Sequence, residues 1–376
     1  MNDLKANFRA KYGSEPRLFR APGRVNLIGE HTDYNDGFVM PCAIDFATVI
    51  AAAARDDRKI HVASMDFEKE LEFDLDAPPE TVGTDWTKYA QGVAYLLEEA
   101  GHRLRGANLL IASDVPVGAG LSSSAALEVA LGLTLSTLAG AAVEKWEIAL
   151  TGQRAEHEYA GVRSGIMDQF ASIFGVENHA LFLDCRSLDW SPIPLSEARF
   201  IICNTKTKHD LADGEYNKRR AECEAAAQRL GVASLRDVAP AEFAAKKDAL
   251  PELLRRRAGH VVTENQRVLD AVDALRGGAL DEFGRLMNLS HESLRDDYEV
   301  SCRELDIMVE LARRQKGVLG ARMTGGGFGG CTVNLLGADA ADDVADRIAA
   351  EYRAATGIEP EIYVCRAAAG AAEVDF

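Results

Sequence analysis

The sequence lacks the usual marks of a disulfide-bonded, zinc-binding or secreted protein. Its seven cysteines are scattered along 376 residues, without a CxxC pair or a cysteine–histidine spacing typical of zinc sites. An odd, dispersed set favours free thiols in a reducing compartment over a disulfide framework. Charged residues occur throughout the first twenty positions, so the sequence predicts no signal peptide and a cytoplasmic location.

Positive charge is also scarce. Lysine and arginine together number 42 against 59 acidic residues, which gives a net charge of −17 at pH 7. Such a surface repels the phosphates of nucleic acids and of anionic lipids, so we expect neither a nucleic acid nor a membrane as partner. One long apolar stretch, residues 125–143, is interrupted by Glu128 and favours a buried helix over a membrane span. A phosphate-bearing ligand would therefore need a local site.

The two commonest nucleotide-binding fingerprints are absent. Residues 116–126 (PVGAGLSSSAA) are rich in glycine and serine, but no Gly-Lys-Ser/Thr follows and the spacing does not match the dinucleotide motif. The stretch joins a predicted strand at 108–112 to a helix that begins at the serines, and the free amides of a helix N-terminus attract anions. From the residues alone, a phosphate-binding loop and a simple cap on a core helix are equally good interpretations.

The length of the chain favours two domains, and we place the boundary near two prolines, between residues 1–194 and 195–376. A hairpin turn is predicted at Asn35-Asp36-Gly37. Helical patterns occur at 144–160, 239–257 and 260–275, among several others. Strands alternating with helices in the second half favour an α+β class, and the acidic C-terminal tail has no predicted role.

Three clusters of residues have the character of a functional site. The first, 21–37 (APGRVNLIGEHTDYNDG), gathers Arg24, Glu30, His31 and Asp33, which could converge on a polyhydroxylated ligand such as a sugar. A solvated loop with a surface histidine is the alternative.

The second cluster lies within 154–175 and places Asp168 among apolar residues. Such a setting would desolvate its carboxylate, and a nearby Arg24 would keep it ionised. Glu156, on the preceding helix, could face the same cavity, although a lone acid on a helix is usually just solvated.

The third cluster, 320–331 (GARMTGGGFGGC), has five glycines in six positions. Glycine costs more conformational entropy than any other residue, so the loop needs a reason beyond simple packing. A second phosphate loop and a packing junction beside the site remain equally open.

Together and in this order, these stretches resemble the galactokinases of the GHMP kinase superfamily. GRVNLIGEHTDYN at 23–35, the serine-rich loop and RMTGGGFGGC are similar to three family motifs. SGIMDQF resembles the catalytic segment, with Ser164 where the family often has cysteine. The resemblance spans nearly the whole chain. It implies a two-lobed α+β fold, with a ribosomal-S5-like N-terminal lobe, a ferredoxin-like C-terminal lobe and the active site between them.

The resemblance also implies an activity, namely ATP-dependent phosphorylation of the anomeric hydroxyl of galactose, with Mg²⁺ as cofactor. Asp168 would be the catalytic base and Arg24 the transition-state stabiliser. The residues that would hold the sugar are Glu30, His31, Asp33, Gly165 and Tyr216. Those that would bind ATP are Gly118, Ala119, Gly120, Leu121, Ser122, Ser123, Ser124 and Trp86, and Ser124 and Glu156 would hold the metal ion. On pattern alone, Tyr216 is an aromatic residue at a helix start and Trp86 could be core packing.

Two other functions compete with this one. One is another GHMP kinase: an N-acetylgalactosamine kinase would differ around Thr32 and Asn35, and a mevalonate kinase would lack the Glu-His-Thr-Asp cluster. A non-catalytic sugar sensor would be expected to lose part of the phosphate loop, which is intact here. We expect a monomer with galactose and Mg·ATP as its partners.

Overall fold

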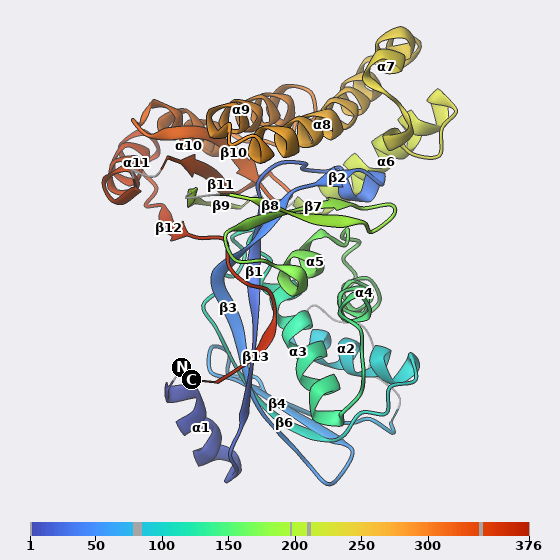
Figure 1. The fold of residues 1–376 in the computed structure, drawn as a ribbon, viewed down its shortest axis with the longest axis vertical. Helices are drawn as coiled ribbons and strands as arrows, with labels where there is room; N and C mark the ends of the chain where they lie inside the picture. Colours follow the sequence, from blue (N-terminus) through green and yellow to red (C-terminus); the bar gives the residue numbers. More distant parts are fainter. Residues whose placement is uncertain (1, 78–84, 196–197, 209–211, 338–340, 376) are drawn as a thin grey trace.

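The computed structural model describes residues 2–77, 85–195, 198–208, 212–337 and 341–375. Within them the chain forms three sheets with helices beside them; the six-stranded sheet lies in the lower part of the view, and the three- and four-stranded sheets lie at a similar height above it (Figure 1). Helices and mostly antiparallel strands occur in both halves, and the predicted α+β class is confirmed. No helix in this described part is long and apolar enough to cross a membrane.

The first sheet has the strand order β13-β1-β3-β6-β4-β5. Its strands are β1 (Arg17–Asn26), β3 (Pro41–Ala54), β4 (Lys59–Ser64), β5 (Leu71–Asp74), β6 (Ala107–Ser113) and β13 (Ala372–Val374). Successive side chains of a strand point to opposite faces. Phe19 and Ile50 therefore enter the main core, while Leu18 and Val49 pack with helix α1 (Asn2–Tyr12).

The main core of this half lies between the sheet and four helices. These are α2 (Thr87–Glu99), α3 (Ser123–Ala139), α4 (Lys145–Ala155) and α5 (Met167–Phe174). Helix α3 is apolar on nearly all sides because it packs against β1, β3 and the three other helices. The helix predicted at 144–160 ends as an α-helix at Ala155 and continues as a π-helical turn, η2 (Glu156–Ala160).

A small middle sheet links the two halves. It has the order β2-β7-β8, formed by β2 (Phe38–Val39), β7 (His179–Asp184) and β8 (Trp190–Pro194). The hairpin predicted at Asn35-Asp36-Gly37 is confirmed in part, because the flanking strands β1 and β3 pair antiparallel, but a longer loop replaces the tight turn. A 3₁₀ turn, η1 (Asp33–Asn35), ends at Asp36 in the left-handed conformation, and β2 then pairs with β7.

The third sheet is antiparallel, in the order β10-β11-β9-β12. Its strands are β9 (Arg199–Lys208), β10 (Val318–Thr324), β11 (Gly329–Leu336) and β12 (Glu361–Cys365). The helices of this half are α6 (Ala212–Leu230), α7 (Pro240–Lys246), α8 (Glu252–Arg276), α9 (Leu280–Asp296), α10 (Arg303–Arg314) and α11 (Ala341–Thr356), with the 3₁₀ turns η3 (Leu235–Asp237) and η4 (Lys247–Ala249).

Two features of this half differ from the sequence prediction. The sequence predicted two helices, at 239–257 and 260–275, with a break between them. In the structure the break comes earlier, because α8 runs unbroken through Gly259 and a separate short helix, α7, precedes it. The acidic tail does have a structural role. Its strand β13 pairs antiparallel with β1, and Arg17 forms an ion pair with Glu373 at 2.6 Å. The end of the chain thus returns to the first sheet.

Candidate active site

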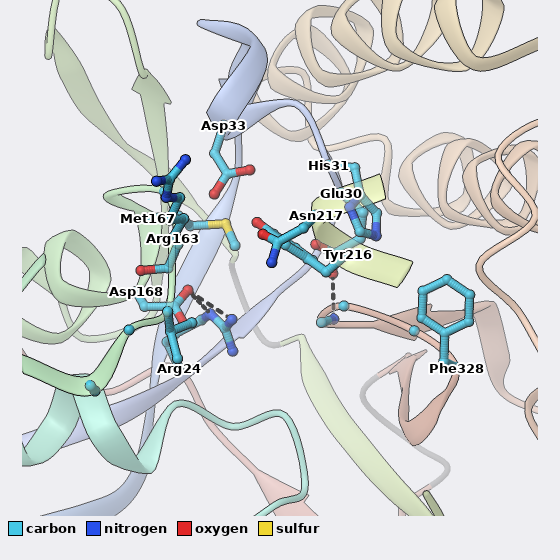
Figure 2. Close-up of a pocket in the computed structure, with 18 residues that line it drawn as sticks. Arg24, Glu30, His31, Asp33, Arg163, Met167, Asp168, Tyr216, Asn217 and Phe328 are labelled. Carbon is cyan, nitrogen blue, oxygen red and sulfur yellow. Dashed lines mark hydrogen bonds and ion pairs between the residues drawn. The ribbon is translucent and has the colours of Figure 1, made fainter. Parts of the chain in front are cut away.

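A cavity of about 480 Å³ brings together residues from both halves of the chain. Its walls come from β1, the loop after β1, the segment around the start of α5, helix α6 and the glycine-rich loop between β10 and β11 (Figure 2). The lining includes all seven residues predicted to be catalytic or sugar-binding: Arg24, Glu30, His31, Asp33, Gly165, Asp168 and Tyr216. Stretches separated by up to three hundred positions therefore meet at one site.

Asp168 and Arg24 form an ion pair on one wall of the cavity (Figure 2). Asp168 lies in the first turn of α5, and its Oδ1 accepts a hydrogen bond from Arg24 Nε at 2.8 Å and lies 2.7 Å from Arg24 Nη2 in the ion pair. The Arg24 side chain is buried and also donates to the Gly120 carbonyl at 2.7 Å. The other oxygen of Asp168, Oδ2, accepts from the hydroxyl of Ser122. A carboxylate beside a fixed cation is the arrangement needed for proton abstraction next to developing negative charge.

Asp33, the first residue of η1, lines the same cavity. Burial raises its pKa to about 7, and the negative charges of Asp168 and Glu30 act in the same direction. Gly165 makes this position possible, because a Cβ on Gly165 would overlap the Asp33 carboxylate. A carboxyl group with a strongly shifted pKa in a cavity is typical of a functional site.

Glu30 lines the cavity but its carboxylate is already occupied. Oε1 accepts hydrogen bonds from the Gly325 amide at 2.7 Å and from Thr324 Oγ1 at 3.1 Å, and Oε2 accepts from Asn26 at 2.9 Å. The buried Arg322 guanidinium lies 3.4 Å away. Glu30 therefore ties the loop after β1 to the glycine-rich loop.

The glycine-rich loop is a packing junction that also forms one wall of the site. Residues 325–328 line the cavity, and Gly325 lies against Gly120 of the serine-rich loop. A Cβ on Gly327 would collide with the Val300 carbonyl. These contacts favour the junction interpretation over a second phosphate loop.

The serine-rich loop leads into α3 as predicted, but its side chains point in different directions. Ala119 and Leu121 are buried in the core, and Gly118, Gly120 and Ser122 have left-handed backbones with φ of 74°, 72° and 59°. Ser123 begins the helix, so the amides of its first turn have no partner within the helix. None of these residues lines the 480 Å³ cavity, but Ser122 and Gly120 reach it through their bonds to Asp168 and Arg24.

The side chains of Ser124 and Glu156 meet beside this loop. The Ser124 hydroxyl donates to Glu156 Oε1 at 2.8 Å, and Ser164 donates to the other carboxylate oxygen. Burial raises the pKa of Glu156, and the charge of Asp168 adds to this effect. The described residues contain no cluster of three or more histidine, cysteine or acidic side chains that could hold a metal alone. One carboxylate and one hydroxyl nevertheless fit Mg²⁺, which keeps several waters and phosphate oxygens as its other ligands.

Trp86 lies outside the cavity, at the start of α2. Its ring stacks on the half-exposed Phe67, with 6.1 Å between centroids and an angle of 26°. It also packs against the main core, and its buried indole nitrogen has no hydrogen-bond partner in the described part of the chain. Both interpretations of Trp86 remain compatible with this position.

Sequence reasoning missed several residues of the site. Arg163, Met167, Asn217 and Phe328 line the cavity (Figure 2), and each is the immediate neighbour of a motif residue that we did single out. Tyr34 and Tyr298 lie behind His31. Tyr298 is far from every predicted motif, and no local pattern pointed to it.

Residues 6–54 match the galactokinase galactose-binding signature, residues 88–176 the GHMP kinases N terminal domain and residues 271–354 the GHMP kinases C terminal domain. A galactokinase of Roseiflexus sp. (strain RS-1) is 48% identical over 99% of this chain and 97% of its own length. The chain belongs to the galactokinase family.

Solved structures agree with this assignment. The crystal structure of Lactococcus lactis galactokinase complexed with galactose has a TM-score of 0.95 and 39% identity, and it covers 99% of both chains. Methanococcus jannaschii mevalonate kinase, at 20% identity and a TM-score of 0.66, shares the fold. The predicted two-lobed GHMP kinase fold is confirmed, and so is the predicted membership of the galactokinase family.

Proposed function

We propose that this enzyme transfers the γ-phosphoryl group of ATP to the anomeric hydroxyl of D-galactose, which yields galactose 1-phosphate and ADP for galactose catabolism. The observation that carries the proposal is the cavity in which Arg24, Asp33 and Asp168 meet beside a serine-rich helix N-terminus. The galactokinases that the chain resembles over nearly their whole length, one of them solved with galactose, support the choice of sugar.

The proposed reaction uses the pair on the cavity wall. Asp168 takes the proton of the anomeric hydroxyl while the sugar oxygen forms a bond to the γ-phosphorus and the bond to ADP breaks. Arg24 lies beside the same carboxylate at 2.7 Å and offsets the negative charge on the transferred group. Because phosphoryl transfer needs little covalent help from the protein, precise placement of these groups is the main requirement.

The sugar would lie in the cavity and the triphosphate over the start of α3. Asp33, beside Gly165, would meet sugar hydroxyls together with Tyr216, Glu30 and His31, which line the same cavity. The backbone amides of residues 118–124 would bind phosphate oxygens, and Trp86 with Phe67 offers an aromatic surface for the adenine.

Ser124 and Glu156 would hold Mg²⁺, whose positive charge neutralises phosphate oxygens when it is bound. Their hydrogen bond keeps two hard oxygen atoms together beside the helix N-terminus.

We further propose that residues 1–194 and 195–376 are the two lobes, with β13 returning to the first, and that the enzyme acts as a cytoplasmic monomer. One chain supplies every residue of the cavity lining. All seven cysteines are free thiols, and five of them are buried, which suits a reducing compartment.

The decisive test measures ADP release with Mg·ATP and galactose, N-acetylgalactosamine, glucose or mevalonate. We expect turnover with galactose and an acid-labile phosphate, which is typical of an anomeric ester. Turnover of another acceptor alone would overturn the proposed substrate. Binding of galactose and ATP without ADP release would make the protein a sugar sensor.

A further inference from the structure

The loop that carries three of the predicted sugar-binding residues is held by a helix from the other half of the chain. This sugar loop, residues 29–38, includes Glu30, His31 and Asp33, which line the cavity. Helix α8 lies against β2, at the end of the loop (Figure 1). The helix is described along its whole length, and none of its residues lines the cavity. An influence of α8 on the sugar site would therefore be indirect.

The two ends of the sugar loop lie side by side. Gly29 has a φ of +94°, and a Cβ at this position would lie 2.6 Å from the Phe38 carbonyl oxygen. Just outside the loop, the Met40 amide donates a hydrogen bond to the Ile28 carbonyl at 3.0 Å. The loop therefore has a narrow base, and its position depends on the groups that hold this base.

Glu264 of α8 holds the first end of the loop. Its Oε1 accepts hydrogen bonds from the Gly29 amide at 2.9 Å and from the Ser290 hydroxyl at 2.6 Å, and its Oε2 accepts from Arg267 Nε at 2.6 Å. The side chain is fully buried. Burial by itself would raise the pKa of Glu264, but nearby positive charge, that of Arg267 above all, lowers it to about 2. The carboxylate is therefore ionised and has a partner on each oxygen.

Asn265, the next residue of α8, holds the other end of the loop. Its Oδ1 accepts a hydrogen bond from the Phe38 amide at 2.9 Å, and its side chain is buried. A Cβ on Gly37 would overlap the same oxygen, so the loop backbone passes directly over Asn265. A backbone amide only donates, which fixes the direction of the hydrogen bonds at both ends of the loop.

We propose that Glu264 and Asn265 are positioning residues that clamp the base of the sugar loop and thereby set the positions of His31 and Asp33 in the cavity. Adjacent residues of one helix bind opposite ends of the loop, so a shift of the loop relative to α8 breaks one or both of these hydrogen bonds. The clamp also joins the two halves of the chain beside the site. Its role in galactose binding rests on the proposed function, whereas the clamp itself does not.

The clamp is tested first on the sugar-free protein, by hydrogen-exchange mass spectrometry of Asn265→Leu. Leucine is similar in size to asparagine but offers the Phe38 amide no acceptor. Peptides that cover residues 29–38 should therefore exchange at least about threefold faster than in wild type, while peptides from β6 and β11 keep their rates. Asn334→Leu is the matched control, because Asn334 is also a buried asparagine bonded to the backbone, at the Ile201 carbonyl, and lies outside the cavity lining.

The exchange measurement separates the clamp from the proposed function. Unchanged exchange of the sugar loop in Asn265→Leu would overturn the inference even if the enzyme phosphorylates galactose. Faster exchange of the loop in a protein without kinase activity would overturn the proposed function alone.

The consequence for the sugar site is tested by steady-state kinetics of the same variants. We expect the KM for galactose to be about 10-fold higher in Asn265→Leu, because His31 and Asp33 lose their fixed positions, with kcat and the KM for ATP changed less than about twofold. Asn265→Asp keeps an acceptor for the Phe38 amide and should bring the KM to within about threefold of wild type. A purely structural role predicts lower stability without this split, as we expect for Asn334→Leu. Equal KM values in wild type and Asn265→Leu would overturn the proposal.

The Glu264 end of the loop is tested with a double variant. Glu264→Met alone would leave the Arg267 guanidinium without its partner, and an unpaired charge in such a place can prevent folding. Glu264→Met combined with Arg267→Met removes both charges and leaves the Gly29 amide without an acceptor. We expect the KM for galactose to rise about 10-fold, with kcat little changed. A folded double variant with the KM and the loop exchange of wild type would overturn the role of Glu264.

Discussion

The carboxylate of Asp168 is shared between Arg24 and the serine-rich loop. Its Oδ1 accepts from Arg24 Nε at 2.8 Å, while its Oδ2 accepts from the Ser122 hydroxyl. Arg24 comes from β1, Asp168 from the first turn of α5 and Ser122 from the residue before α3. Three elements thus meet at one carboxylate. Both carboxylate oxygens of the proposed base therefore accept hydrogen bonds from the protein.

Replacement of Asp168 by asparagine should abolish turnover while sugar binding survives. The amide keeps the shape of the side chain but cannot take the proton of the anomeric hydroxyl, so we expect kcat to fall about 10³-fold. Steady-state kinetics and galactose calorimetry would measure the two effects separately. Asp189→Asn, at an exposed position between β7 and β8, is the control. Near-normal turnover in Asp168→Asn would contradict the assignment of the base.

Gly165→Ala should damage the sugar site through Asp33. The new Cβ would overlap the Asp33 carboxylate, which must then move. Because a displacement of about 1 Å in an active site can cost 10²-fold, we expect kcat/KM for galactose to fall about 100-fold, mainly through KM. Gly214→Ala meets nothing within 4 Å and provides the comparison. Equal behaviour of the two variants would show that Asp33 is not confined by Gly165.

Several parts of the site were predictable because their sequence signals are local. Glycines followed by serines and an apolar run are enough to place a loop before α3, and Arg24, Asp33 and Asp168 stood out as polar residues among apolar neighbours. Their convergence was expected only through the family resemblance. The ion pair between Arg24 and Asp168 links positions 144 residues apart, and no periodicity carries that information.

Other features depended on tertiary contacts that short stretches do not encode. Strand β13 has three residues, and its existence depends on the free edge of β1. Helix α8 continues unbroken through Gly259 because its packing against α6 and α9 stabilises it. The hydrogen-bond donors to the Glu30 carboxylate come largely from the end of β10 and the loop after it, almost three hundred residues away in the sequence.

The affinity for galactose should rise as the pH increases through neutrality. Burial raises the pKa of Asp33 to about 7, so the free enzyme holds a neutral carboxyl below that value and an accepting carboxylate above it. If the carboxylate is the form that binds sugar hydroxyls, kcat/KM should increase from pH 5.5 to about 7 and then level off. Asp33→Asn should be weaker and lack this limb of the profile. A limb that persists in Asp33→Asn would assign the titration to another group.

Glu156→Gln should weaken the response to Mg²⁺. The substitution keeps one oxygen beside Ser124 but removes the negative charge that a divalent cation requires. We expect the Mg²⁺ concentration for half-maximal rate at fixed ATP to rise at least about tenfold, with the KM for galactose little changed. Glu158→Gln is the matched control, since Glu158 lies on the same π-helical turn but pairs with Arg154 at the surface. An unchanged Mg²⁺ requirement would remove Glu156 from the metal site.

A second buried acid, Glu128 on α3, should make the protein less stable as the pH rises. Its Oε2 accepts from Gln169 at 2.8 Å, and burial together with the charges of Glu156 and Asp168 raises its pKa well above the usual range. The folded state therefore retains a proton that the unfolded state releases near pH 4.5. Between these two pKa values the unfolded state binds fewer protons, so this group lowers the free energy of unfolding by about 1.4 kcal/mol per pH unit.

The variant Glu128→Gln lacks this contribution. Its free energy of unfolding relative to wild type, measured by urea denaturation, should increase steadily from pH 5.5 to 7.5. The exposed Glu177→Gln is the control and should show no trend. A difference between Glu128→Gln and wild type that stays constant across this range would mean that Glu128 is already ionised in the folded protein.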